Sequence, residues 1–209
     1  MKRLSCLVLA MALVSLMAAG CRRNTDDPTP TDPTVGQTDP TGDPTEPSGT
    51  PTSSGALQIL QTVWDSYGEE EKFAAVGGDP DNMVDGAPGA FSLEDTDALT
   101  YSLAIPAEQL PNIDEAASLV HGMLSNNFTC GVFHLVEGAD ATSFAQAMYN
   151  AVQNSQWMCG MPERVIVAVV EQDYVLMAYG VEDALGLFQQ KLTTAYPNTQ
   201  IAHSAAITG

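Results

Sequence analysis

The chain is poor in basic residues. Its 209 residues include only seven Lys and Arg but 26 Asp and Glu, which gives a formal net charge of −19 at pH 7. The imbalance continues through residues 56–209, which hold 20 acidic side chains but only three basic ones. A surface of this kind repels phosphate backbones, because it lacks the clustered Lys and Arg side chains that neutralise them. The composition therefore predicts that the protein does not bind nucleic acid.

Recognisable catalytic motifs are also missing. The chain contains no G-x-S-x-G and no C-x-x-C, the patterns that present a nucleophilic serine or a redox-active pair of thiols. Pairs of carboxylates are so numerous that no single pair marks an active site. The sequence therefore favours a protein that is not an enzyme, and it predicts no cofactor.

No apolar run is long enough for a permanent membrane span. The longest one, Leu7–Leu16, follows two basic residues and precedes the small residues Ala-Ala-Gly that lead to Cys21. This order is typical of a lipoprotein signal peptide. We predict that residues 1–20 are removed and that Cys21 is lipidated, which would hold the protein on the outer face of the cell membrane. The alternative is an ordinary secretory signal in which Cys21 has no special role.

Residues 21–55 have almost no apolar side chains. The segment is dominated by Thr, Pro, Asp, Gly and Ser, and Val35 is its one large aliphatic residue. Such a composition cannot offset the entropy lost on ordering, so we predict a disordered linker. At about 3.1 Å per residue in a polyproline-like conformation, the linker could span on the order of 100 Å. Its predicted role is to hold a domain away from the lipid.

The rest of the chain, residues 56–209, is predicted to form a single α+β domain. Helical spacing of apolar residues predicts helices over 56–67, 112–124 and 182–196, and a further helix that Asp140 caps. Alternating or continuous apolar residues predict strands over 99–105, 128–136, 164–170, 174–180 and 200–207. We expect a mainly antiparallel or mixed sheet of about four to five strands with the helices packed on it.

Cysteine is scarce in the predicted domain, which contains only Cys130 and Cys159. In an exported protein, two remaining cysteines are candidates for a disulfide. Together with His121 and His134 they are also the one concentration of soft-metal ligands, and a Cys2His2 set would suit zinc. Along a strand, however, Cys130 and His134 would lie roughly 13 Å apart. The sequence leaves a disulfide, two free thiols and a metal site as alternatives.

Two further segments contain residues of types that bind ligands. Asp79, Asp81, Asn82 and Asp85 crowd a glycine-rich stretch, which suits calcium, but a solvated turn is the favoured interpretation. The second segment contains Trp157, Met158 and Met161. Methionine and aromatic side chains most often belong to the core, but together they also line peptide-binding grooves. We therefore treat the second segment as a candidate binding patch.

Three stretches, residues 59–79, 114–135 and 157–169, together resemble a family of small lipoproteins from gut Firmicutes. They read ILQTVWDSYGEEEKFAAVGGD, DEAASLVHGMLSNNFTCGVFHL and WMCGMPERVIVAV. Members of this family are often called hypothetical and are sometimes labelled bacteriocin transport accessory protein. The resemblance implies the compartment and the fold more than an activity, and it supplies no catalytic residues.

The leading expectation is a lipid-anchored, extracytoplasmic binding or accessory protein of the cell envelope. Its partners would be the membrane, through Cys21, and an envelope or transporter protein. The alternative is an envelope enzyme or metal-dependent factor that uses His121, Cys130, His134 or Cys159.

Overall fold

The computed structural model describes residues 55–208. The predicted signal peptide, the lipidation site Cys21 and the linker up to residue 54 lie outside the described residues. Among the residues described, no helix is long and apolar enough to cross a membrane.

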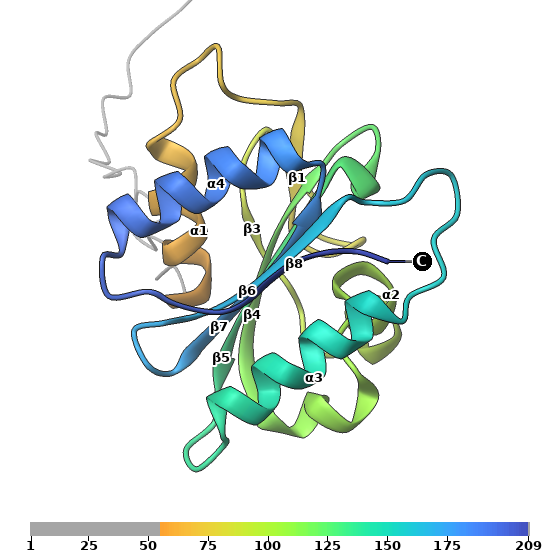
Figure 1. Cartoon of the computed structure of the whole chain (residues 1–209). Coiled ribbons are helices and arrows are strands. Elements are labelled where there is room, and N and C mark those ends of the chain that lie inside the picture. Colours follow the sequence, from red (N-terminus) through yellow and green to blue (C-terminus); the bar gives the residue numbers. More distant parts are fainter. Residues whose placement is uncertain (1–54, 209) are drawn as a thin grey trace, which may run out of the picture. The chain divides into compact units, whose positions relative to one another are not determined.

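The centre of the domain is one open sheet of eight strands in which every pair is antiparallel (Figure 1). The strand order is β2-β1-β4-β5-β7-β6-β8, and β3 also pairs with β4. The strands are β1 (Ala75–Gly77), β2 (Val84–Asp85), β3 (Gly89–Ala90), β4 (Ile113–His121), β5 (Phe128–Leu135), β6 (Arg164–Val170), β7 (Tyr174–Gly180) and β8 (Gln200–Ala206). The α+β class and the antiparallel sheet are confirmed, but the expected count of four to five strands is too low.

Four α-helices cover the two faces of this sheet (Figure 1). The first face carries α1 (Gly55–Asp65) and α4 (Glu182–Ala195), and the second carries α2 (Thr96–Leu103) and α3 (Ala141–Gln153). Short 3₁₀ helices over Ala107–Asn112 and Ser125–Asn127 lead into β4 and β5. We call the two sides the α1–α4 face and the α2–α3 face.

The central strand β5 shows why two cores form. Phe128, Cys130 and Val132 point into the core beneath α1 and α4, whereas Phe133 and Leu135 belong to the core beneath α2 and α3. This division follows from the two-residue repeat of a strand, and the sequence predicts it. Both faces of β5 are buried, so each face needs its own cover of helices.

Several other predicted elements are confirmed. Strands β6 and β7 occupy their predicted segments and pair as an antiparallel hairpin, α4 occupies its predicted segment, and β8 lies at the edge of the sheet. Helix α3 begins after Asp140, whose carboxylate accepts a hydrogen bond from the Thr142 N–H at 2.9 Å. That contact satisfies one of the free N–H groups at the start of the helix, as an N-cap does.

Two neighbouring predictions are wrong. Residues 99–105 were expected to form a strand, but helix α2 covers most of that segment. Residues 112–124 were expected to form a helix, but the strand β4 takes their place. Asp95 caps α2 through the Ala98 N–H at 2.9 Å. Residues 116–119 of β4 are buried on both faces of the sheet, so their apolar residues follow no two-residue repeat.

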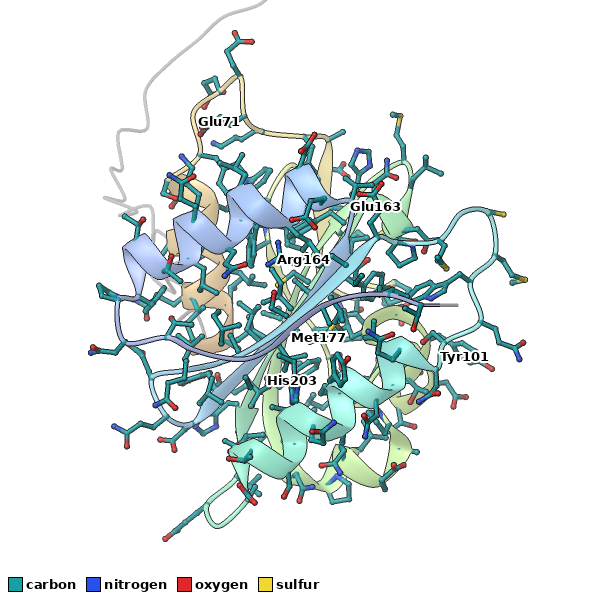
Figure 2. All side chains as sticks on the ribbon, in the orientation of Figure 1. Glu71, Tyr101, Glu163, Arg164, Met177 and His203 are labelled. Carbon is teal, nitrogen blue, oxygen red and sulfur yellow. The ribbon has the colours of Figure 1, made fainter. Side chains whose placement is uncertain are left out.

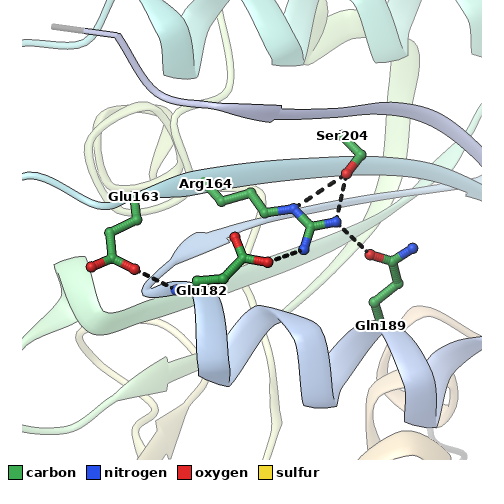
Figure 3. A network of polar contacts seen from close by, with 5 residues as sticks. All are labelled: Glu163, Arg164, Glu182, Gln189 and Ser204. Atoms are coloured by element: carbon green, nitrogen blue, oxygen red, sulfur yellow. Dashed lines mark hydrogen bonds and ion pairs between the residues drawn. The ribbon is translucent and has the colours of Figure 1, made fainter.

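A polar network on the α1–α4 side ties the edge strand to its helix (Figure 3). The Arg164 guanidinium on β6 donates to Glu182 Oε1 at 2.7 Å, to Gln189 Oε1 at 2.8 Å and to Ser204 Oγ at 2.6 Å. Glu163 Oε2 accepts from the Glu182 N–H at 2.7 Å, at the start of α4. One arginine therefore joins β6, β8 and α4.

Candidate functional site

Two adjoining hollows open at the end of the sheet where β4 and β7 finish. Their volumes are about 560 Å³ and about 570 Å³. Tyr101, Ser125 and Tyr179 line both hollows, so the two share a wall. We call the pair, with Tyr101 between them, the end groove.

The end groove is lined by several exposed apolar side chains. Among residues 55–208, seven large hydrophobic residues are exposed: Met83, Val84, Tyr101, Met123, Leu124, Met158 and Met161. Met83, Tyr101, Met123 and Met158 line the hollows, and the other three lie within three residues of a lining methionine. Tyr101 is 88% exposed and Met158 is 82% exposed. Contiguous apolar exposure of this kind marks interaction sites, because scattered exposed residues would show no such grouping.

Asp79 builds the first wall of the groove. Its carboxylate is buried and accepts hydrogen bonds from the backbone N–H groups of Asp81, Asn82 and Ser92 at 3.0–3.1 Å. Burial raises the pKa of Asp79, but these hydrogen bonds and those from the Asn82 side-chain amide outweigh burial and leave the pKa below its ordinary value. The carboxylate therefore fixes the turn that presents Met83 and has no lone pair left for calcium.

A close approach of backbones places this turn. A Cβ at Gly77 would lie 2.1 Å from the Gly89 N atom, so only glycine lets β1 pass so near β3. Gly78 has a φ of 84°, and its carbonyl accepts a hydrogen bond from the buried Ser118 hydroxyl at 2.9 Å. The paired glycines thus hold the turn against β4.

His121 orders the second wall. Its Nδ1 accepts hydrogen bonds from the N–H groups of Met123 and Leu124 at 3.2 and 3.3 Å. Its ring stacks on Phe73 with 5.4 Å between the ring centroids. The imidazole therefore has a structural role, since it shapes the turn whose apolar side chains face solvent.

Asn126 ties the third segment, residues 154–163, to this turn. Its Nδ2 donates to the carbonyl oxygens of Met158 at 3.0 Å and Gly160 at 2.7 Å. Cys159, between them, has a φ of 63°, an uncommon conformation for a residue with a side chain. The Asn126 amide therefore fixes the backbone on both sides of Cys159 and helps to set the position of Met158.

The floor of the second hollow is aromatic. The Trp157 ring lies 5.0 Å from the Tyr179 ring between centroids, and burial raises the pKa of Tyr179, against a smaller opposing effect of the Thr129 hydroxyl. The Trp157 Nε1 atom is buried and has no hydrogen-bond partner among residues 55–208. An unsatisfied donor of this kind costs about 1–3 kcal/mol.

The groove lies away from every cation in the described part of the chain. Each basic side chain there is paired with a carboxylate elsewhere: Lys72 with Glu69, Arg164 with Glu182 and Lys191 with Glu71. In Figure 2, Glu71 and Tyr101 lie on opposite sides of the sheet. No Lys or Arg side chain among the described residues lines either hollow.

The two candidate cysteines are free thiols, so the disulfide considered from the sequence is absent from this structure. Cys130 lies in the core of the α1–α4 face, whereas Cys159 is exposed in a segment whose Trp157 packs on the α2–α3 face. Burial raises the pKa of the Cys130 thiol well above its ordinary value, which makes it a poor nucleophile at neutral pH.

The proposed soft-metal set is also dispersed. His121 lies at one end of the β4–β5 pair, while His134 pairs with Glu115 near the other end and contacts Asp114. No group of three or more His, Cys, Asp or Glu side chains within residues 55–208 is placed to hold a metal ion. The expectation that His121 approaches Cys130 or His134 assumed a helix over 112–124. That segment is a strand, which places His121 two residues from Leu119, the register partner of Cys130, and far along the strand from Glu115, the register partner of His134.

Sequence reasoning found one part of the groove and missed the others. Trp157 and Met158 of the candidate patch line the second hollow. Tyr101, Met83 and Asn126 were missed. Tyr101 offered a signal, because it falls between the helically spaced Leu99 and Leu103 and so points away from the core. No signal in the sequence brings these segments together.

Comparison of the chain with family models, with curated proteins and with solved structures finds no match.

Proposed function

We propose that the protein is a lipid-anchored, extracytoplasmic binding module of the cell envelope that docks a partner in the end groove. The lipid anchor at Cys21 and the linker over 21–55 would present the domain, and the groove would hold the partner. The family resemblance would make this partner a component of an export system. Catalysis plays no part in this proposal.

One observation carries the proposal. Four of the seven exposed large hydrophobic side chains of the described residues line two adjoining hollows, and the other three lie within three residues of a lining methionine. Burial of these side chains against a partner would stabilise the complex by about 25 cal/mol per Å² of apolar surface removed from water. Exposed methionines also adapt their shape to different partners, because the side chain is unbranched and flexible.

The titratable groups at the groove support binding rather than chemistry. The Asp79 carboxylate accepts hydrogen bonds from three backbone N–H groups, and His121 Nδ1 accepts hydrogen bonds from two others. Both groups therefore hold the backbone turns that present the apolar side chains of the groove. Cys130, His134 and Cys159 lie outside both hollows, so the alternative of an enzyme that uses His121, Cys130, His134 or Cys159 gains no support.

Site-specific crosslinking in the native host would test the proposal. Tyr101 of the full chain is replaced by the photoreactive residue p-benzoylphenylalanine, and intact cells are irradiated. We expect a discrete covalent adduct, because the side chain at position 101 would lie inside the interface. The matched control places the same residue at Thr194, which is exposed on α4 at a distance from the groove.

The adduct should disappear when Met123→Ser and Met158→Ser are added to the position 101 variant. Both methionines are more than three-quarters exposed, at 78% and 82%, so these changes leave the fold intact. Equal adducts at positions 101 and 194, or none at either, would overturn the groove as a docking site.

The anchor has its own test. Labelled palmitate should enter the wild-type chain in its native host and should not enter Cys21→Ala. Failure of wild-type labelling would remove the membrane anchor from the proposal but would leave the groove untouched.

A further inference from the structure

Exposed carboxylates flank the end groove and have no cationic partner. Asp81 belongs to the same turn as Met83, and Asp97 precedes Tyr101 by one turn of α2, so these two share a helix face. Both carboxylates are exposed, and neither takes part in a salt bridge within residues 55–208. The groove thus combines an apolar lining with an uncompensated negative margin.

We infer that the occupant of the end groove is a basic amphipathic peptide segment. Two large apolar side chains of the segment enter the hollows on either side of Tyr101, and nearby Lys or Arg side chains lie against Asp81 and Asp97. This assignment rests on the proposed function and adds the chemical class of the partner to it.

The shape of the groove favours a polypeptide over a small molecule. Two hollows that share the wall formed by Tyr101 and Tyr179 match two successive side chains on one face of a peptide. The rim is formed largely by methionines, which repack around apolar side chains of different shape. A single rigid ligand would need one enclosed cavity with fixed polar groups instead.

The charge of the domain favours a cationic partner over an anionic surface. Residues 56–209 carry 20 acidic side chains, and the three basic ones are all paired away from the groove. This field attracts Lys and Arg during the encounter and repels anionic lipid headgroups. A membrane surface is therefore a poor occupant, although an exposed apolar rim alone would suit one.

Binding of model peptides to the full chain tests the class of partner. The chain is reconstituted in nanodiscs of neutral phosphatidylcholine, and binding of labelled peptides is followed by fluorescence anisotropy. The probes are an amphipathic Leu/Lys peptide, its Leu/Glu counterpart and a Lys/Ser peptide without apolar residues, with empty nanodiscs as background. We expect saturable binding of the Leu/Lys peptide alone, and weaker binding at higher salt.

Two pairs of substitutions assign the binding to the groove. Met123→Ser with Met158→Ser should weaken the Leu/Lys peptide by about tenfold or more, because both hollows lose their rim. Asp81→Asn with Asp97→Asn should weaken it by about threefold, as expected for exposed charge pairs. The matched control, Glu137→Gln with Asp173→Asn, removes the same charge near the opposite end of the sheet and should have little effect.

The other outcomes separate this inference from the proposed function. If the Leu/Glu peptide binds equally well and the methionine substitutions weaken both, the groove stands and the basic class is wrong. If the Lys/Ser peptide binds as well as the Leu/Lys peptide, or the methionine substitutions have no effect, attraction is unspecific and the inference is overturned. Preferential binding of the domain to anionic vesicles would overturn it as well. If no peptide binds, the inference is wrong. Crosslinking at position 101 still tests separately whether a partner docks in the end groove.

Discussion

The two faces of the sheet differ at their edges, and the difference is clearest in the hydrogen bonding of their tryptophan side chains. On the α1–α4 face, Trp64 Nε1 donates to the Gly86 carbonyl at 3.0 Å, and Lys72 lies over the indole ring. On the α2–α3 face, Trp157 packs against Tyr179, but its buried N–H has no partner among the described residues. The two indole N–H groups therefore differ, since that of Trp64 has an acceptor and that of Trp157 has none, although the buried Tyr67 hydroxyl of the α1–α4 core also lacks a partner among the described residues.

The polar contacts of the α1–α4 face stabilise the fold, whereas the exposed apolar side chains of the end groove are available to contact a partner. The α1–α4 face adds ion pairs from Lys191 and Arg164 across its elements. The end groove has no equivalent, and its exposed side chains are apolar. Departures from good local design tend to gather at functional sites, because selection there acts on contact with a partner. The comparison predicts that the same kind of substitution has different consequences in the two regions.

The largest expected difference is in the reactivity of the two thiols. Cys130 is fully buried in the α1–α4 core, and Cys159 is exposed beside the groove. Without reductant, iodoacetamide should modify Cys159 promptly and Cys130 at least about a thousandfold more slowly, because Cys130 reacts only when its core opens. The raised pKa of Cys130 slows it further. Peptide mass spectrometry over time measures both rates.

Either of two results would contradict this prediction. Protection of both thiols until reductant is added would show a disulfide between them. Equal labelling rates would show that the α1–α4 core opens as easily as the groove segment.

The next largest difference concerns two aromatic side chains. Phe128 is fully buried and contacts Phe73 and Phe188, with 5.1 and 5.2 Å between ring centroids. Phe128→Ala should lower the free energy of unfolding by about 3–5 kcal/mol, since it leaves a cavity. Tyr101→Ala should change it by less than about 0.5 kcal/mol, because the ring is almost wholly in solvent. Urea denaturation of the full chain measures both.

If Phe128→Ala does not fold, a milder substitution still allows Phe128 to be compared with Tyr101. Phe128→Leu keeps much of the side-chain volume and should still cost more than Tyr101→Ala. A loss above about 1 kcal/mol for Tyr101→Ala would show that the ring supports the fold, contrary to its assignment as a docking residue.

The fold was predictable where one physical signal dominates. The β6–β7 hairpin is readable because two apolar runs flank a short polar turn, Glu171-Gln172-Asp173. Helix α3 is readable because Asp140 precedes an amphipathic stripe. In both segments local propensity and the burial pattern indicate the same structure, so a single sequence is sufficient.

The fold was not predictable where the burial pattern is ambiguous. The apolar residues of β4 have helical spacing, yet the strand is buried on both faces and carries a bulge between Ile113 and Glu115. A bulge shifts the two-residue repeat and removes the signal of a strand. In α2 the alternation of Leu99, Tyr101 and Leu103 imitates a strand, although the Asp95 cap indicates a helix.

The end groove was even less accessible from the sequence. Trp157 and Met158 could be suspected because two large apolar residues lie in a segment without regular structure. Met83, Tyr101 and Met123 come from segments far apart in the chain, and only the pairing of β1 with β4 and the packing of α2 on β5 bring them to one end. Site residues gathered by topology carry no local signature.

A smaller difference is expected between the two tryptophans. Trp64→Phe removes a hydrogen bond and leaves the Gly86 carbonyl without its indole donor, while Trp157→Phe removes an unsatisfied donor. Both substitutions lose similar volume, so the difference reports the hydrogen bond of Trp64 together with the contact between Lys72 and its indole ring. Trp64→Phe should be less stable than Trp157→Phe by about 1–3 kcal/mol in urea denaturation. Equal losses would show that Trp157 has a partner in solution, such as an ordered water.

The smallest effect concerns Asp79, the buried carboxylate of the groove's first wall. Asp79→Asn replaces one acceptor with a donor that faces the N–H of Ser92, and should cost about 1–2 kcal/mol at neutral pH. Because the pKa of Asp79 is lowered in the folded state, its contribution is present above the unfolded pKa of about 3.9 and is lost as the pH falls through the folded pKa. The difference in the free energy of unfolding between wild type and Asp79→Asn should therefore narrow below about pH 4.

Asp81→Asn, whose exposed side chain lies two residues away, is the matched control and should show little difference from wild type at any pH. A difference for Asp79→Asn that stays constant on acidification would mean that the charge of Asp79 does not fix the turn presenting Met83.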